Sequence, residues 1–365
     1  MEKKVPFLDL RLDENGRRDL LSVIDTVLAH GRIVLGPEVQ ELEQRIAEYC
    51  GRKYAVGVGS GTDALFLGLK SLNIGPGDEV ITTSLSWIAT ANAIALTGAT
   101  PVFADICDDL NIDPSSVRRL ITPKTKAILP VHFTGKVCKM LQLIQIAEEH
   151  NLLLVEDAAQ AFGATLNGRR AGSYGAIACF SMNQMKIFGS CGDAGMIVTD
   201  REDIQRKLIA LRHNGMVDRT ECIEVSLNGR IDTIHAAILL HRLKSVDEII
   251  EKRREIAGWY DERLAGIVEL PRQAEGENDI RFSYQIRTDR RDELMAFLLA
   301  NGIETQIQHP ILMPHQPAYR VNVQGEFSNA ERLVKRILCI PNNEKLSRDD
   351  VDYVADTIRS FFAKG

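Results

Sequence analysis

The stretch that decides the fold is residues 54–72, which read YAVGVGSGTDALFLGLKSL. Tyr54–Val58 is a short apolar run typical of a buried strand, and the leucines that follow repeat at helical spacing. A glycine-rich segment, residues 59–62, joins the two patterns. This strand–glycine–helix unit is typical of α/β proteins, in which backbone N–H groups at a helix N-terminus can bind an anion.

The same alternation of apolar runs and helical patterns continues through the first two thirds of the chain. We expect further strands at 79–83, 101–106, 126–131, 152–156, 176–181 and 194–199, and helices at 140–150, 201–213 and 231–243. Alternating strands and helices predict an α/β fold, here a large domain over residues 1–244 with a mostly parallel mixed sheet.

A second, smaller α+β domain is predicted over residues 245–365. Residues 245–264 have the spacing of a long amphipathic helix that connects the two domains. The remaining pattern predicts a strand, a helix and a strand at 282–287, 290–300 and 303–307. Ser347 is a candidate N-cap for a final helix, with two aspartates in its first turn.

The composition excludes several classes of protein. The 365 residues carry 44 Lys and Arg against 50 Asp and Glu, a net charge of −6 without basic runs, which disfavours nucleic-acid binding. Residues 80–104 are uncharged, but polar residues, glycine and proline interrupt them, so no membrane span is predicted. Seven cysteines without a CxxC pair indicate reduced thiols, hence a cytoplasmic protein without a disulfide framework, and we predict no metal site.

The glycine-rich segment is the first candidate site. Gly59 to Thr62 can bind a phosphate, or it can be an ordinary turn in which Thr62 caps the helix. Together with Gly57 the segment nearly matches a dinucleotide fingerprint, but Thr62 replaces the third glycine and no acidic residue follows the second strand. A nicotinamide dehydrogenase is therefore a weak alternative.

Three further residues are candidates for chemistry. Asp157 follows an apolar strand and needs a cation or a protonated ring nitrogen, unless it only caps a helix at 158–162. Lys186 lies among apolar and small residues in a loop, where it is either a nucleophile and base or a solvated side chain. Trp87 follows the second strand and either stacks on a ring or packs in the core.

Together, a phosphate site, an aspartate after a central strand and a loop lysine are the parts that pyridoxal 5′-phosphate (PLP) requires. The lysine binds the aldehyde covalently, and the aspartate keeps the pyridine nitrogen protonated. The glycine-rich segment holds the phosphate. The combination indicates a PLP-dependent enzyme more strongly than any of its parts.

The motifs of the chain resemble the DegT/StrS family of PLP-dependent sugar-nucleotide aminotransferases. The resemblance extends from about Phe7 to the end of the chain. It rests on VEDAAQAFGA (155–164), GRRAGS (168–173), GSGTDAL (59–65), GPGDEVI (75–81), IATANAI (88–94), GATPVFAD (98–105), LPVH (129–132), LNGRID (227–232) and QPAY (316–319).

This resemblance implies the aspartate aminotransferase fold, known as fold type I, and a homodimer with active sites at the subunit interface. It implies that Lys186 binds PLP covalently and that Asp157 contacts the pyridine nitrogen. The other cofactor contacts that it implies are Ser60, Gly61, Thr62, Trp87, Gln160, Ser181 and, from the neighbouring subunit, Asn228. Arg230 of the neighbouring subunit and His309 match substrate-side residues of the family.

The chain departs from the family pattern at several positions. Met182 replaces a Phe, Ala194 replaces a Gly, His235 replaces a Gln, and Gln308-His309-Pro310 stands where many members have His-Tyr-Pro. These changes leave the cofactor residues intact but bear on the sugar that is bound. His132, His309 and His315 can each be structural, and His309 is the strongest candidate for a site residue.

The resemblance predicts a PLP-dependent aminotransferase that converts a nucleotide-linked keto-sugar to the amino-sugar, with L-glutamate as amino donor. Some relatives that dehydrate sugars carry His at the lysine position, so Lys186 favours transamination. A sugar dehydratase of the same family and a non-catalytic sensor of PLP or nucleotide-sugar are the alternatives.

Overall fold

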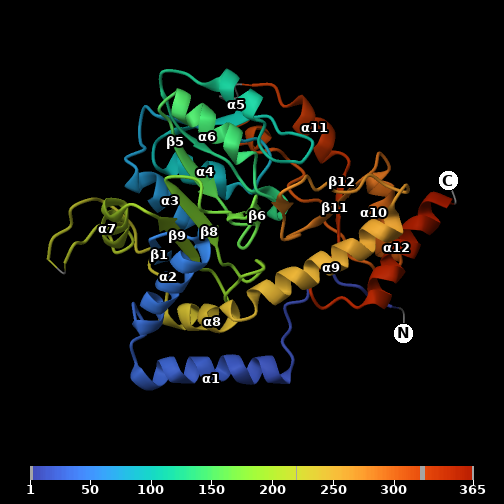
Figure 1. The fold of residues 1–365 in the computed structure, drawn as a ribbon, viewed down its shortest axis with the longest axis horizontal. Helices are drawn as coiled ribbons and strands as arrows, with labels where there is room; N and C mark the ends of the chain where they lie inside the picture. The colour runs from blue at the N-terminus through green and yellow to red at the C-terminus, as the bar shows by residue number, and fades with distance from the viewer. Residues whose placement is uncertain (1–2, 219, 321–324, 364–365) are drawn as a thin grey trace.

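The fold is built around a seven-stranded mixed sheet at the centre of Figure 1. The computed structural model describes residues 3–218, 220–320 and 325–363. The strand order is β1-β9-β8-β5-β4-β2-β3, with bounds β1 Tyr54–Val58, β2 Glu79–Thr83, β3 Thr100–Ala104, β4 Thr125–Leu129, β5 Leu153–Asp157, β8 Ile177–Ser181 and β9 Gly195–Thr199. Strand β9 is antiparallel to both neighbours and the other adjacent pairs are parallel, which confirms the predicted sheet.

Helices cover both faces of this sheet. One hydrophobic cluster joins one face to α2 (Pro37–Cys50), α5 (Pro114–Leu120), α6 (Met140–Glu149) and α8 (Thr233–Leu243). A second cluster joins the other face to α3 (Gly61–Ser71), α4 (Ala89–Leu96) and α7 (Glu202–Leu211). The resulting three layers are typical of α/β proteins, since parallel sheets bury both faces. Helix α1 (Glu14–His30) lies beside α8 in Figure 1.

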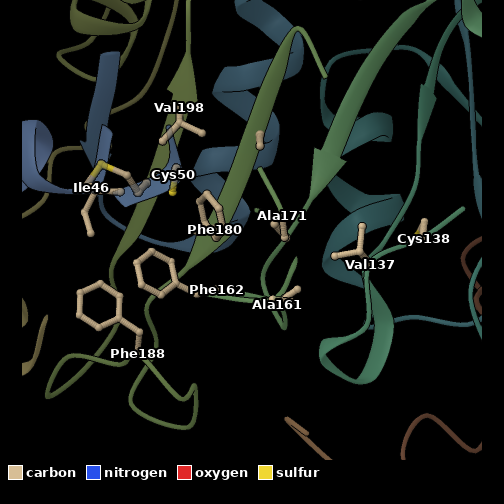
Figure 2. Close-up of a cluster of buried hydrophobic side chains, with 14 of the residues drawn as sticks. Ile46, Cys50, Val137, Cys138, Ala161, Phe162, Ala171, Phe180, Phe188 and Val198 are labelled. Carbon is tan, nitrogen blue, oxygen red and sulfur yellow. The ribbon is translucent and has the colours of Figure 1, made fainter. Parts of the chain in front are cut away.

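Three phenylalanines in the first cluster connect loops that come from different parts of the chain (Figure 2). Phe162 stacks on Phe188 with ring centroids 4.4 Å apart and meets Phe180 edge-on at 5.4 Å. Phe162 follows Asp157, Phe188 lies two residues beyond Lys186, and Phe180 belongs to β8. The aromatic packing therefore fixes the segments that carry Asp157 and Lys186 relative to the sheet.

Most of the last third of the chain packs around one hydrophobic cluster, formed by α9 (Val246–Leu264), β11 (Tyr284–Arg287), α10 (Arg291–Ala300), β12 (Ile337–Ile340) and α12 (Arg348–Ala363). Figure 1 shows α9 running from α8 toward this region. Helix α11 (Ser328–Val334) packs in a different cluster, with Phe103 of β3 and Phe133. Strands β11 and β12 form an antiparallel pair. A further small sheet joins β6 (Thr165–Leu166), β7 (Arg169–Arg170) and β10 (Glu277–Asn278). The division of the chain at residue 245 stays a prediction.

One predicted strand and two of the alternatives left open by the sequence are wrong, and one predicted cap is confirmed. Residues 303–307 form only two isolated bridges, and residues 158–162 form turns in place of a helix. Thr62 does not cap α3, because Ser60 Oγ accepts the N–H of Asp63 at 3.0 Å and is the N-cap. Ser347 Oγ does accept the N–H of Asp350 at 3.2 Å, as an N-cap does.

Among the described residues, we find no helix that combines the length and apolar character needed to span a bilayer.

Candidate active site

The predicted site residues come from loops at one edge of the central sheet. Strands β1 and β8 are both antiparallel to β9, and β8 is parallel to β5, so these three strands end at the same edge. The glycine-rich segment follows β1, Asp157 ends β5, and the lysine loop follows β8. Ligands of α/β proteins bind outside the carboxyl ends of strands, so this edge is the candidate active site.

Asp157 is a buried carboxylate, 3% exposed. Its Oδ2 accepts a hydrogen bond from Thr90 Oγ1 at 2.8 Å, and its Oδ1 accepts the N–H of Ala159 at 3.1 Å. Burial raises the pKa of Asp157, while the Thr90 hydrogen bond opposes that rise. No ion pair is formed by Asp157 within the described ranges, so its carboxylate lacks the cation that a buried charge requires.

The adjacent Glu156 is also a buried carboxylate, but both of its oxygens have hydrogen-bond partners. Its oxygens accept hydrogen bonds from the N–H groups of Gly172, Tyr174 and Gly175 at 2.7–2.8 Å and pair with His132 Nε2 at 2.9 Å. Burial alone would raise the pKa of Glu156, but these partners, His132 foremost, lower it. Glu156 was not predicted as part of the site, because its hydrogen-bond partners lie on other segments of the chain.

Lys186 lies in the loop between β8 and β9. Backbone hydrogen bonds from Met182 to Ala194 and from Gln184 to Gly192, at 2.7 and 3.1 Å, hold the base of this loop. Burial lowers the pKa of Lys186, and the negative charge of Asp157 partly restores it. The side chain of Lys186 is half-buried, and its role as nucleophile and base stays a prediction. Lys186 Nζ also lies 4.9 Å from the centre of the Phe282 ring.

The glycine-rich segment meets the end of β8 closely. A Cβ built on Gly61 would lie 2.6 Å from Ser181 Cβ, so only glycine fits at the start of α3 against this serine. Gly61 and Thr62 belong to the first turn of α3, and Ser60 is its N-cap. The N–H groups of this turn and the hydroxyls of Thr62 and Ser181 together suit a phosphate.

Aromatic rings cover the same edge. Trp87 is 62% exposed, so the alternative of core packing is wrong for this residue. Its ring centre lies 5.8 Å from that of His309, which lies 5.7 Å from Phe133. Burial and the nearby Lys186 charge lower the pKa of His309 to about 4, so its imidazole is neutral at pH 7.

The remaining predicted residues also lie at this edge. Gln160 is buried in the turn after β5, and its Oε1 accepts the N–H of Thr134 at 3.0 Å. Arg230 pairs with Val58 of β1, and its guanidinium donates to Asn228 Oδ1 at 2.8 Å. The structure thus brings every predicted site residue to the ends of β1, β2, β5 and β8 or onto the segments that pack against them.

Comparison with known families decides the class of protein. Residues 15–359 match the DegT/DnrJ/EryC1/StrS aminotransferase family. The chain belongs to this family. The resemblance predicted from the motifs is confirmed, and the fold is that of fold type I aminotransferases.

Two curated relatives are similar to this chain over nearly its whole length. The dTDP-3-amino-3,4,6-trideoxy-alpha-D-glucose transaminase of Streptomyces venezuelae is 39% identical over 98% of this chain and 96% of its own. A protein of Geobacillus stearothermophilus named pleiotropic regulatory protein is 37% identical over 98% of both chains. One of these two relatives is thus named as an enzyme and the other as a regulatory protein.

Solved structures agree with the fold. DesV of S. venezuelae, in complex with a ketimine intermediate, has a TM-score of 0.95 at 39% identity over 98% of both chains. NtdA of Bacillus subtilis, with bound cofactor PMP, has a TM-score of 0.93 at 32% identity over 99% of this chain and 85% of its own. PMP is the amino form of PLP, the cofactor predicted from the sequence.

Proposed function

We propose that this chain is a PLP-dependent aminotransferase that converts a nucleotide-linked keto-sugar to the amino-sugar, with L-glutamate as donor. The proposal includes a homodimer with shared active sites and a cytoplasmic location, in which its seven free cysteines stay reduced. The name of the S. venezuelae transaminase supports the substrate class.

The observation that carries this proposal is that Asp157 and Lys186 lie at the same edge of the sheet and influence each other's charge without forming an ion pair within the described ranges. Asp157 is a buried carboxylate without a cation among the described residues, and a protonated pyridine nitrogen supplies that cation. Lys186 has a pKa lowered by burial, which increases the fraction of neutral amine able to react. The residues present therefore fit PLP.

When bound, PLP supplies an electron sink that stabilises negative charge on the carbon bearing the transferred amino group. Lys186 Nζ has two roles: it anchors the cofactor, and once released it moves a proton between two atoms of the reacting molecule. Asp157 holds its negative charge against the ring nitrogen. Thr90 orients that carboxylate through the hydrogen bond to Oδ2.

The other site residues bind and orient. Ser60, Gly61, Thr62 and Ser181 would hold the phosphate of PLP, and Trp87 would stack on its ring. Gln160 would donate to the ring hydroxyl. In the active site of the neighbouring subunit, Asn228 would contact the phosphate of PLP and Arg230 the sugar nucleotide, while His309 would contact the sugar. His309 does so as a neutral group, since its pKa lies near 4.

A sensor is the second candidate function, because a relative of similar identity is named a regulatory protein. It would use the same residues to bind PLP or a nucleotide-sugar without turnover. The dehydratase alternative lacks such support, and the retained Lys186 disfavours it.

A panel of keto-sugar nucleotides tests the proposal. Purified, PLP-loaded protein is incubated with L-glutamate and UDP-, dTDP- and GDP-linked 3-keto and 4-keto sugars, and products are read by mass and NMR. An amino-sugar product that is absent with Lys186→Ala supports the aminotransferase. Binding of a nucleotide-sugar without any product supports the sensor.

A further inference from the structure

Three glutamine side chains from separate segments form a chain of hydrogen bonds that ends at the candidate active site. Gln285 lies on β11, Gln308 on the segment before Pro310, and Gln160 in the turn after β5. Gln285 Nε2 donates to Gln308 Oε1 at 2.8 Å, and Gln308 Nε2 donates to Gln160 Oε1 at 3.4 Å. The chain crosses from the last third of the sequence to the central sheet.

The orientation of each amide follows from its partners. The N–H of Thr134 can only donate, so the acceptor 3.0 Å from it is Gln160 Oε1, and Gln308 must present its NH₂ group to that oxygen. Gln308 Oε1 then accepts the hydroxyl of Ser283 at 3.1 Å. Gln160 Oε1 then accepts two donors, the N–H of Thr134 at 3.0 Å and the NH₂ of Gln308. An amide whose oxygen is occupied in this way presents its NH₂ group to a ligand. Gln160 is therefore set as a hydrogen-bond donor.

Gln308 is not itself one of the predicted site residues. It is neither charged nor able to titrate, and many members of the family carry a histidine at this position. Gln308 is half-buried, and a polar side chain that makes several hydrogen bonds lowers the number of arrangements open to its neighbours. The neighbour it restrains on the active-site side is Gln160.

We propose that Gln308 is a positioning residue that fixes the amide of Gln160 as a donor to the ring oxygen of PLP. This inference rests on the proposed function. A donor at that oxygen stabilises its negative charge and weakens its hold on the proton shared with the lysine nitrogen. Gln308 thereby sets the pH at which the bound cofactor changes colour, although it does not touch the ring itself.

The test is a pH titration of the visible absorption band of the full-length, PLP-loaded protein. The variants are Gln308→Met, Gln160→Met and the double variant, with Gln306→Met as a matched control because Gln306 is exposed two residues away. We expect Gln308→Met to raise the apparent pKa of the band by roughly half a unit or more, the scale of one weakened hydrogen bond. Gln160→Met raises it at least as much, and the double variant no further.

A second variant guards against a folding defect in Gln308→Met. Gln308→Glu keeps the shape but offers only acceptors, so it repels Gln160 Oε1 and attracts the NH₂ group of Gln160 away from the ring, against the N–H of Thr134 that favours the present orientation. We expect a larger upward shift than with Met, and a smaller one when Gln160 is already Met.

The outcomes separate this inference from the proposed function. Unchanged titration in both Gln308 variants, or shifts that add fully to that of Gln160→Met, would overturn the positioning role. A wild-type protein that forms no visible band with PLP would overturn the proposed function itself. A shift in Gln306→Met equal to that in Gln308→Met would show a general effect of the segment and also overturn the inference.

Discussion

Thr90 Oγ1 donates a hydrogen bond of 2.8 Å to Asp157 Oδ2, and both side chains are buried. This contact joins the N-terminal end of α4 to the end of β5. It opposes the rise in the pKa of Asp157 that burial causes. Because a carboxylate must be charged to stabilise a protonated ring nitrogen, we expect Thr90 to support cofactor binding through Asp157.

Thr90→Val removes this hydrogen bond while keeping the shape of the side chain. The pKa of Asp157 then rises further, and we expect PLP to bind about tenfold more weakly, as loss of one hydrogen bond to a charged group implies. The measurement is a fluorescence titration of the apo protein with PLP. Thr90→Ser, which keeps the hydroxyl, serves as the control, and equal affinities for Val and wild type would contradict the role.

Glu156→Gln tests the buried carboxylate beside the catalytic one. Its folded pKa lies below the unfolded value near 4.5, so ionised Glu156 stabilises the fold above that pH and the contribution declines as pH falls. We expect the variant to lose about 2 kcal/mol at pH 7, because an NH₂ group would face backbone N–H donors. Urea unfolding compares both proteins at pH 7 and pH 4, and a difference that grows toward pH 4 would refute the assignment.

Gly61→Ala tests the phosphate site. The added Cβ would lie 2.6 Å from Ser181 Cβ and push the start of α3 away from β8. We expect PLP affinity to fall about tenfold or more, since the N–H groups at this helix start lose their alignment. Gly258→Ala is the matched control. It lies in α9 with no atom within 4 Å of the new Cβ, and should leave PLP affinity unchanged.

Mixing two inactive variants tests whether active sites are shared between subunits. If Arg230 serves the neighbouring site, a heterodimer of Lys186→Ala and Arg230→Ala has one site with both changes and one intact site. Co-expression with two different tags should then recover about a quarter of wild-type activity, since half of randomly paired dimers are heterodimers. Recovery no greater than the sum of the separate variants would place Arg230 in its own subunit's site.

The strands of the sheet were predictable because each is a short apolar run bounded by glycine or polar turns. Tyr54–Val58 and Glu79–Thr83 match the predicted bounds, and the other strands of the central sheet differ by one or two residues. Helices α1, α2, α5 and α11 were not predicted. The segment Ile303–Ile307 was wrongly assigned as a strand, since it finds only single bridging partners in Val5 and Cys339.

The residues of the candidate site also differ in whether the sequence predicts them. Lys186, Asp157 and the residues after Val58 could be singled out from motif and position, and their roles stay predictions. The supporting residues were not, because their roles exist only in three dimensions. Glu156 depends on His132 from the segment after β4, Thr90 on Asp157, and Gln308 on Gln160. No local pattern distinguishes such residues from other polar ones.

Transamination through Lys186 is tested most directly by the first half-reaction alone. PLP-loaded protein is mixed with L-glutamate without sugar, while the visible band and 2-oxoglutarate are followed together. We predict that the band disappears and about one 2-oxoglutarate forms per site, with Lys186→Ala at least about a thousandfold slower. A band that persists with glutamate and every other common amino acid, without keto acid released, would contradict it.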